Sequence, residues 1–338
     1  MKVGADPGMG VRRTARIRAR RATRTADAAQ LGLCARREAH KPSFALKIEL
    51  YSTALGVGMP LDRRTGKRWE ARPTPTVRRM DFDFTRVPKH WAGGSVFASH
   101  LSNGLNVLFP DGERFFVRSV RHYLDQLEDP KLRASVQAFF GQEGSHAREH
   151  QRTFEILESQ GLDPKPFLRR YRWFAFKMLE PRVSPVFRLA VTAACEHFTA
   201  SFAHDGLTRD DLAKADPAMR ALLYWHAAEE IEHKSVAFDV LQEVDGRYSM
   251  RVAGMVAAMI LLTSMWTMGV ASFLRQDEDA TLGRLWRELR VARKEGHVGS
   301  GRMFSMFKDY FRRDFHPDQV DDYELARSYL ESVGRLAA

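Results

Sequence analysis

Two short motifs place an acidic side chain three residues before an imidazole. Glu143 precedes His146, and Glu230 precedes His233. In a helix, residues three apart lie about one turn apart on one face, so each motif presents a carboxylate beside an imidazole. A single Glu-x-x-His pair arises by chance on a charged, solvated helix face. Two copies on separate predicted helices favour a shared chemical site.

Two further glutamates lie in apolar surroundings on two other predicted helices. Glu113 comes just before the run that begins at Phe115, near a helix start, and Glu196 lies within the apolar stretch from Leu189 to Phe198. A buried carboxylate is costly unless it is paired, so Glu196 requires a cation. One glutamate from each of two helices and Glu-x-x-His from each of two others is the ligand pattern of dinuclear carboxylate sites in ferritin-like bundles.

Other histidines and glutamates lie close to this pattern. His226 precedes Glu230 by four residues on the same helical stripe, so we predict it as a ligand, with a core histidine beside the site as the alternative. His150 is predicted to lie next to the ligands without binding metal. Four other side chains lie about 100° around the helix from the ligand positions. Three of them are predicted to be solvated or paired with Arg and Lys: Glu149, Glu229 and Glu232. The fourth, His197, is predicted to point away from the site. The predicted metal ligands are therefore Glu113, Glu143, His146, Glu196, His226, Glu230 and His233.

This donor set predicts two bound metal ions and a redox enzyme. Hard oxygen donors stabilise oxidised iron, so two iron ions are expected, with manganese or zinc as alternatives. The predicted function is an O₂-dependent diiron oxygenase or oxidase for an apolar or amine substrate. The alternative is a metal-dependent hydrolase with a metal-bridging water, in which Glu149 or Glu229 accepts the proton. A second alternative is a non-enzymatic, membrane-attached metal-binding protein. The sequence assigns no catalytic residue beyond the ligands.

Helix start signals predict the elements that position these residues. Asp129-Pro130, Ser184-Pro185 and Asp216-Pro217 each combine an N-cap with a first-turn proline. They predict helices over 130–161, 185–204 and 217–244. Strand patterns are almost absent after residue 80, so the predicted fold is all-α: a ferritin-like four-helix bundle with extra C-terminal helices. The other predicted helices cover 96–108, 114–127 (after a break at Pro110–Gly112), 252–274, 282–294, 302–311 and 317–333.

The charge of the chain is concentrated at its N-terminus. The 338 residues carry a net charge of +11, and residues 1–79 hold 19 Lys and Arg against 6 Asp and Glu. We predict a disordered basic tail and linker over 1–79, or an over-long start, and a helical metal-binding domain over 80–338. The tail has few aromatic residues for base stacking, so no nucleic-acid partner is expected. With only two cysteines, the protein is expected in the reducing cytoplasm.

One predicted helix carries no charge over its whole length. Residues 252–274 form a 23-residue apolar segment, which in a helix rises about 35 Å, enough to cross hydrocarbon. The prediction is a membrane-inserted helix that attaches the protein to the inner membrane, and the alternative is a buried core or dimer-interface helix. The expected partners are a small-molecule substrate, lipid-like if the helix enters a membrane, and a redox partner. The oligomeric state cannot be predicted.

The chain from about Arg79 to Val333 resembles a bacterial family described as predicted metal-dependent hydrolases, which belongs to the ferritin-like superfamily. The segment His226-x-x-x-Glu230-x-x-His233 is also similar to diiron aryl-amine N-oxygenases, in which an extra histidine precedes the second Glu-x-x-His by one turn. That similarity implies that His226 is a seventh ligand. The segment 252–274 departs from the N-oxygenase pattern, and nothing matches its amine pocket. The family resemblance rests on 109–116, 142–150, 195–199 and 225–234.

Overall fold

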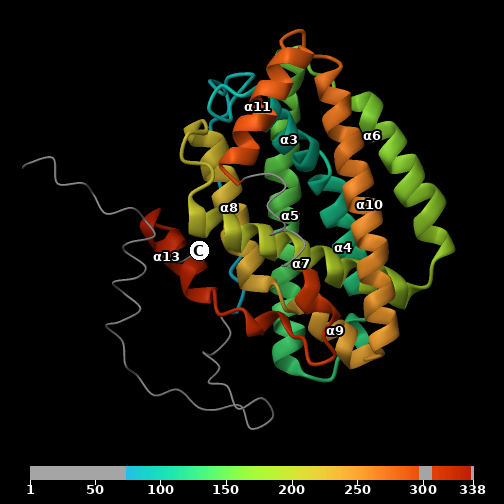
Figure 1. The fold of residues 1–338 in the computed structure, drawn as a ribbon. Coiled ribbons are helices and arrows are strands. Elements are labelled where there is room, and N and C mark those ends of the chain that lie inside the picture. Colours follow the sequence, from blue (N-terminus) through green and yellow to red (C-terminus); the bar gives the residue numbers. More distant parts are fainter. Residues whose placement is uncertain (1–73, 297–306, 336–338) are drawn as a thin grey trace, which may run out of the picture. The chain divides into compact units, whose positions relative to one another are not determined.

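The computed structural model describes residues 74–296 and 307–335, and most of these residues are helical (Figure 1). They contain no β-strand, and the one isolated bridge joins Ala92 to Ala215. The predicted all-α fold is therefore confirmed. The α-helices are α3 (Val96–Asn106), α4 (Phe109–Arg121), α5 (Pro130–Ser159), α6 (Lys165–Arg172), α7 (Pro185–Arg209), α8 (Pro217–His233), α9 (Val236–Val244), α10 (Tyr248–Leu274), α11 (Leu282–Lys294) and α13 (Tyr323–Ser332). Short 3₁₀ or π turns are η1 (Leu124–Gln126), η2 (Trp173–Leu179), η3 (Glu180–Arg182), η4 (Asp309–Phe311) and η5 (Pro317–Gln319).

The three predicted N-caps begin the three helices that they were expected to begin. The side chain of Asp129 accepts a hydrogen bond from the Lys131 N–H at the start of α5. Ser184 accepts from Phe187 at the start of α7, and Asp216 caps α8 in the same way. Each cap is followed by proline, whose missing N–H costs nothing in a first turn. Local sequence thus fixes where three of the site-bearing helices begin.

Helices α4, α5, α7 and α8 pack against one another and share one apolar core. α4 lies against α5 and α7, and α8 lies against α5 and α7. Fully buried side chains between them include Val120, Phe139 and Leu189. Helices α9 and α10 cover α7 on its other sides. Four helices therefore bring their inward faces to a common interior, as the predicted bundle requires.

Helix boundaries differ from the sequence prediction at several points. Pro110 does not break the chain: it occupies the first turn of α4, which begins at Phe109, so Glu113 lies inside a helix. The predicted helix 217–244 is divided at Lys234–Ser235 into α8 and α9. Helix α6 was not predicted, and 317–333 forms η5 and α13. Helix 282–294 is confirmed, whereas most of the tail and residues 302–306 lie outside the described residues.

Residues before α3 contribute to the core. Phe84, Val87 and Trp91 are buried, although they lie outside any helix. The indole N–H of Trp91 donates to Asn103 on α3. Aromatic residues in this stretch bury enough apolar surface to hold it against the bundle without regular secondary structure.

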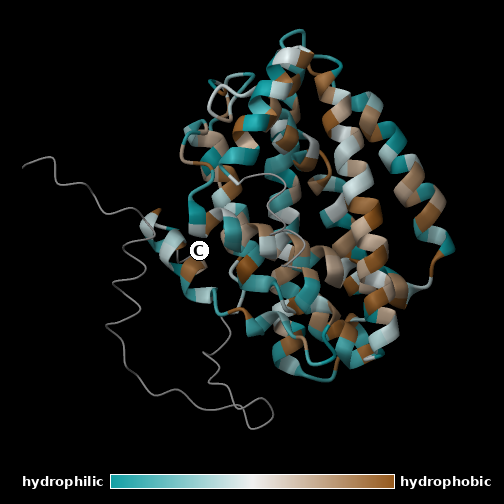
Figure 2. Ribbon diagram, in the orientation of Figure 1, coloured by the Kyte–Doolittle hydropathy of each residue, from teal (hydrophilic) through white to brown (hydrophobic). Residues whose placement is uncertain are grey.

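Helix α10 is long and apolar enough to cross a membrane by length and composition. Figure 2 shows few hydrophilic residues along it. One face packs on α7 and α3, where Gly254 lies against Ala190 and Gly269 against Gly104. The opposite face, with Val256 and Ile260, is exposed. In the described residues, α10 is therefore a half-buried helix held to the bundle by close backbone contacts.

Replacing Gly254 with alanine is expected to destabilise the protein by about 1–3 kcal/mol. A Cβ at this position would lie 2.5 Å from the backbone carbonyl of Ala190, which cannot move without shifting α7. The matched control is Gly144→Ala, because Gly144 lies within α5 with nothing within 4 Å of an added Cβ. This control should stabilise by about 0.5–1 kcal/mol. Thermal unfolding measures both, and equal effects would disprove the close contact.

Candidate metal centre

The seven predicted ligands come from four helices and are all buried. Helix α4 supplies Glu113, and α7 supplies Glu196. Helix α5 supplies Glu143 and His146, each with no exposed surface. Helix α8 supplies the other three side chains, His226, Glu230 and His233, which are at most 4% exposed. The structure thus brings together every residue predicted as a ligand.

The donor atoms fall into three overlapping groups, in each of which they lie within 4.8 Å of one another. Because Glu143 and His146 each belong to two groups, the groups form one continuous cluster. Its members lie in the order Glu113, His146 and His226; then Glu143, His146 and Glu230; then Glu143, Glu196 and His233.

Glu230 and Glu143 lie between the two ends of this cluster. Glu230 Oε1 is 2.7 Å from His226 Nε2, whereas its Oε2 is 3.5 Å from His233 Nε2. Glu143 Oε1 is 3.1 Å from His233 Nε2 and 3.9 Å from His146 Nδ1. Two ligand atoms that each lie about 2.0–2.2 Å from one ion are about 3 Å from each other when the ligand–metal–ligand angle is a right angle. The distances above therefore suit side chains that bind the same ion. A carboxylate that faces both ends is placed to bridge two ions.

Most of the inward-facing atoms make no hydrogen bond within the described residues. Both carboxylate oxygens of Glu113, Glu143 and Glu196 lack one, as does Oε2 of Glu230. His233 Nε2 is also unsatisfied, although it lies 3.2 Å from Glu196 Oε2. Unsatisfied buried polar atoms are rare and require an explanation such as an ion. Oxygen and imidazole donors around one interior point fit divalent cations.

The electrostatics of the site also indicate missing positive charge. Burial raises the pKa of Glu113 and of Glu143 well above the ordinary value, and neighbouring glutamates add to the effect. The same causes raise the pKa of Glu196 to about 7. Burial disfavours the His233 cation, but the facing carboxylates outweigh it and raise the His233 pKa. Without metal, the site must retain protons to limit repulsion among its carboxylates.

A hydrogen-bonded chain orients His146. Its Nε2–H donates to Glu229 Oε2 at 3.0 Å, which directs Nδ1 towards Glu143 and Glu230. Glu229 in turn accepts from Trp225 at 2.8 Å and from Arg78 at 3.0 Å. Such outer hydrogen bonds fix the tautomer and the ring orientation of a metal-binding histidine.

The same arginine supports the second Glu-x-x-His histidine. His233 Nδ1–H donates to Gln142 Oε1 at 2.9 Å, and the Gln142 amide donates to Glu232 at 2.8 Å. Arg78 forms two hydrogen bonds with Glu232, at 2.7 and 2.8 Å. One buried guanidinium therefore holds the outer partners of both histidines, His146 and His233. Glu229 and Glu232 are predicted to be either solvated or paired with basic residues. The pairing is confirmed, because both contact Arg78 and neither is exposed to solvent.

His226 has a different outer partner. Its Nδ1 lies 2.5 Å from His150 Nε2, and His150 Nδ1 contacts the side-chain oxygen of Asn106. His150 lies beside the ligands, as predicted, and orients one of them. His197 packs against aromatic residues including Tyr310, away from the cluster. Glu149 is buried and pairs with Arg148 and Arg152.

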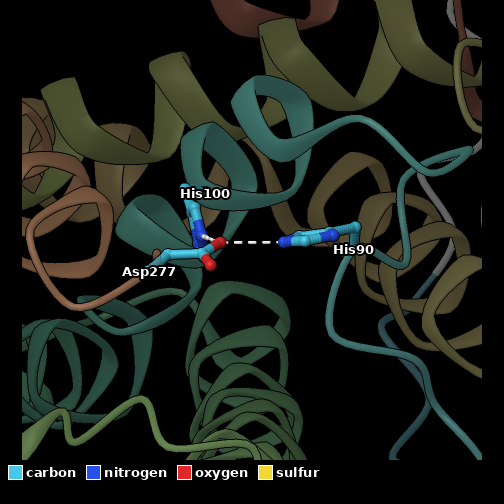
Figure 3. A group of neighbouring side chains, drawn as sticks. All are labelled: His90, His100 and Asp277. Carbon is cyan, nitrogen blue, oxygen red and sulfur yellow. Dashed lines mark hydrogen bonds and ion pairs between the residues drawn. The ribbon is translucent and has the colours of Figure 1, made fainter. Parts of the chain in front are cut away.

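A fourth group with metal-binding spacing lies elsewhere (Figure 3). His90 and His100 approach the same oxygen of Asp277 at 2.8 and 2.7 Å, and Lys89 contacts the other oxygen at 2.6 Å. Every polar atom of Asp277 is thus satisfied within the protein. The group connects the end of α10 to α3 and has none of the unsatisfied oxygens of the main cluster.

A large apolar pocket adjoins the cluster at its α4 and α8 side. It has a volume of about 660 Å³, and Glu113, His226 and Glu230 form part of its lining. The remaining wall is mostly aromatic and aliphatic, with residues from α4, η2, α7 and α10. The apolar pocket therefore opens directly onto one end of the cluster.

These features define an all-helical protein with buried His and Glu clusters that can hold metal. The chain belongs to the family described as predicted metal-dependent hydrolases, whose family model matches residues 76–321. No curated protein and no solved structure matches the chain. The sequence resemblance to this family is therefore confirmed. The family match begins at residue 76 and so includes Arg78.

Arg78 lies within the stretch predicted as a basic tail, and the sequence gives no sign of its role. Its neighbours Arg72 and Arg79 have the same residue type, so composition does not distinguish it. The signal in the structure is burial: Arg78 is 2% exposed and faces Glu229 and Glu232.

Replacing Arg78 with glutamine is expected to weaken metal binding by about 10–100-fold, because Glu229 and Glu232 would no longer be held in place behind the two histidines. Arg79→Gln is the matched control, since Arg79 is the exposed neighbour. Competition against a chelator measures both affinities. Equal affinities in the two variants would show that Arg78 does not support the site.

Metal affinity is expected to fall as the pH falls from 8 to 6. Glu196, with a pKa of about 7, and the two carboxyl groups with raised pKa values hold protons that must leave when metal binds. His233, whose pKa is also raised, must lose its proton too. Each displaced proton weakens binding by up to about tenfold per pH unit below its pKa. Titration calorimetry in buffers of different ionisation enthalpy counts the protons released, and a count of zero would contradict the raised pKa values.

Proposed function

We propose that this protein is a metal-dependent enzyme in which two metal ions act on an apolar substrate held in the adjoining pocket. The observation that carries the proposal is the set of unsatisfied carboxylate oxygens of four buried glutamates beside a 660 Å³ apolar pocket. Two divalent ions would balance four carboxylates, which a folded protein does not otherwise bury together.

The proposed ligands divide between the two ions by their positions. Glu113, His146 and His226 would hold the ion at the pocket end, and Glu196 and His233 would hold the other. Glu143 and Glu230 would bridge, because their oxygens face both ends. The pocket-end ion is then the one that a substrate reaches.

Hydrolysis is the first reaction class, and it is supported by the family description. Two bound ions would lower the pKa of a coordinated water and polarise a carbonyl or phosphoryl group. Neither carboxylate predicted as proton acceptor lines the pocket: Glu149 is held by arginines, and Glu229 by Arg78 and Trp225. In the proposed site Glu113, which lines the pocket and does not bridge the ions, would accept the proton through its second carboxylate oxygen.

O₂-dependent oxidation is the second candidate, and the donor set favours it. Four glutamates and three histidines form a carboxylate-rich environment of the kind that stabilises oxidised iron. The pocket lining is apolar, so it would keep water away from the reacting groups and would hold an apolar substrate by packing. In this reaction class the metal is iron, and the protein's own residues hold the ions and exclude solvent.

Replacing Glu196 with glutamine is expected to reduce the stoichiometry from two ions to one per chain, because the second ion loses a carboxylate that nothing else replaces. Glu232→Gln is the control: it removes a carboxylate that faces Arg78 instead of the cluster, so two ions should remain at saturating metal. Plasma mass spectrometry of the metal-loaded proteins measures this. Two ions in both variants would refute the proposed ligand set.

The reaction classes differ in their requirement for O₂. A hydrolase should cleave long-chain acyl esters anaerobically with Zn²⁺ or Mn²⁺ bound. An iron oxidase should consume O₂ after reduction, with a change in its near-ultraviolet absorption, and should be inactive with zinc. Activity with zinc in the absence of O₂ would establish hydrolysis and exclude the oxidase.

A further inference from the structure

The surface of α6 and η2 combines basic and aromatic side chains. Trp173 is 56% exposed and Phe174 is 37% exposed, which is unusual for residues of this size. Arg169, Arg170 and Lys177 are exposed beside them. We call these five residues the α6 face.

The α6 face lies at the edge of the apolar pocket. Phe174 itself belongs to the pocket lining, together with Phe176 from the same segment. On the other side the lining includes Ile260 of α10, which is 62% exposed, and Val256 one turn earlier is 45% exposed. Helices α6 and α10 contact each other and lie side by side in Figure 1. The pocket therefore opens where two segments with exposed apolar residues meet.

The basic residues of the α6 face are available to an external partner. Arg169, Arg170 and Lys177 form no ion pair with the described residues, whereas Arg172 on the same helix pairs with Asp111. Exposed Trp and Phe beside unpaired Lys and Arg are the composition of helices that lie in the headgroup region of anionic membranes.

A second copy of the chain fits this surface less well. In a two-fold symmetric contact the same patch meets itself, so the three basic side chains would face their own counterparts. A lipid surface supplies the opposite charge and also accepts the exposed Trp173, Phe174 and Ile260.

We propose that the α6 face and the exposed residues of α10 dock on an anionic lipid surface, and that the pocket takes up a long hydrocarbon chain from it. The part that concerns substrate uptake rests on the proposed function, whereas docking does not. The docking is peripheral: the buried face of α10 keeps its contacts with α7 and α3, so α10 lies along the protein instead of spanning the membrane.

The test is binding of the full-length protein to vesicles of phosphatidylcholine with phosphatidylglycerol, measured by sedimentation. Trp173→Ala is expected to lower the partition coefficient about tenfold, and Arg169→Gln with Arg170→Gln about fivefold for each charge removed. Trp286→Ala is the matched control, because Trp286 on the basic helix α11 is 59% exposed but lies outside the pocket lining. The control matters because the basic charge of the first 79 residues is the same in every variant and would attract anionic vesicles equally.

Three outcomes would overturn the proposal. Equal partitioning of Trp173→Ala and Trp286→Ala would show that binding depends on general positive charge. Unchanged vesicle binding with loss of a dimer in Trp173→Ala, seen by analytical ultracentrifugation, would identify the surface as an interface between copies. Equal binding to pure phosphatidylcholine would show that the surface does not recognise anionic lipid.

The same vesicle assay separates docking from the metal centre. Glu196→Gln is expected to bind vesicles as the unchanged protein does, because Glu196 is fully buried and is not part of the α6 face. Uptake is tested with a spin-labelled palmitate, whose signal should broaden when it enters the pocket, and Ile260→Arg at the pocket edge should prevent this. Vesicle docking without palmitate uptake would refute the substrate part alone. Uptake without docking would refute the docking.

Discussion

The structure depends on the burial of like charge. Four glutamates with almost no exposed surface lie around one interior point, and most of their oxygens have no hydrogen-bond donor in the described residues. In a low-dielectric interior, the Coulomb repulsion among four carboxylates is larger than the stabilisation that packing supplies. Either bound protons or bound cations must therefore reduce the negative charge. The pKa of Glu196 is raised, and hydrogen bonds hold His146 and His233 in orientation; both features suit a site that binds cations.

The surrounding bundle serves this constraint at several levels. Caps at Asp129, Ser184 and Asp216 fix the starts of three helices and hence the positions of the carboxylates along them. Arg78 then holds the outer hydrogen bonds of both Glu-x-x-His histidines at once. One side chain thus supports a histidine at each end of the cluster.

Sequence periodicity predicted the site better than it predicted the helix boundaries. The ligand stripes follow from spacings of three and four residues, which a helix converts into a shared face whatever its exact ends. The predicted break at Pro110 is wrong because proline is well tolerated in a first turn, and α4 begins at Phe109. Arg78 was missed for a different reason: only the tertiary fold distinguishes a buried arginine from its exposed neighbours. The pocket could not be predicted, because it is formed by side chains from segments far apart in the chain.

The apolar helix α10 shows why composition alone does not decide the environment of a segment. Its 27 residues satisfy the length and hydropathy of a membrane span, yet one face is used for close packing through Gly254 and Gly269. A helix that both seals a bundle and lines a pocket must be apolar on nearly all sides. Its exposed residue Ile260 belongs to the lining of the apolar pocket, which also includes Glu113 and His226. The lack of charge in this segment thus follows from the pocket that it lines as well as from the core.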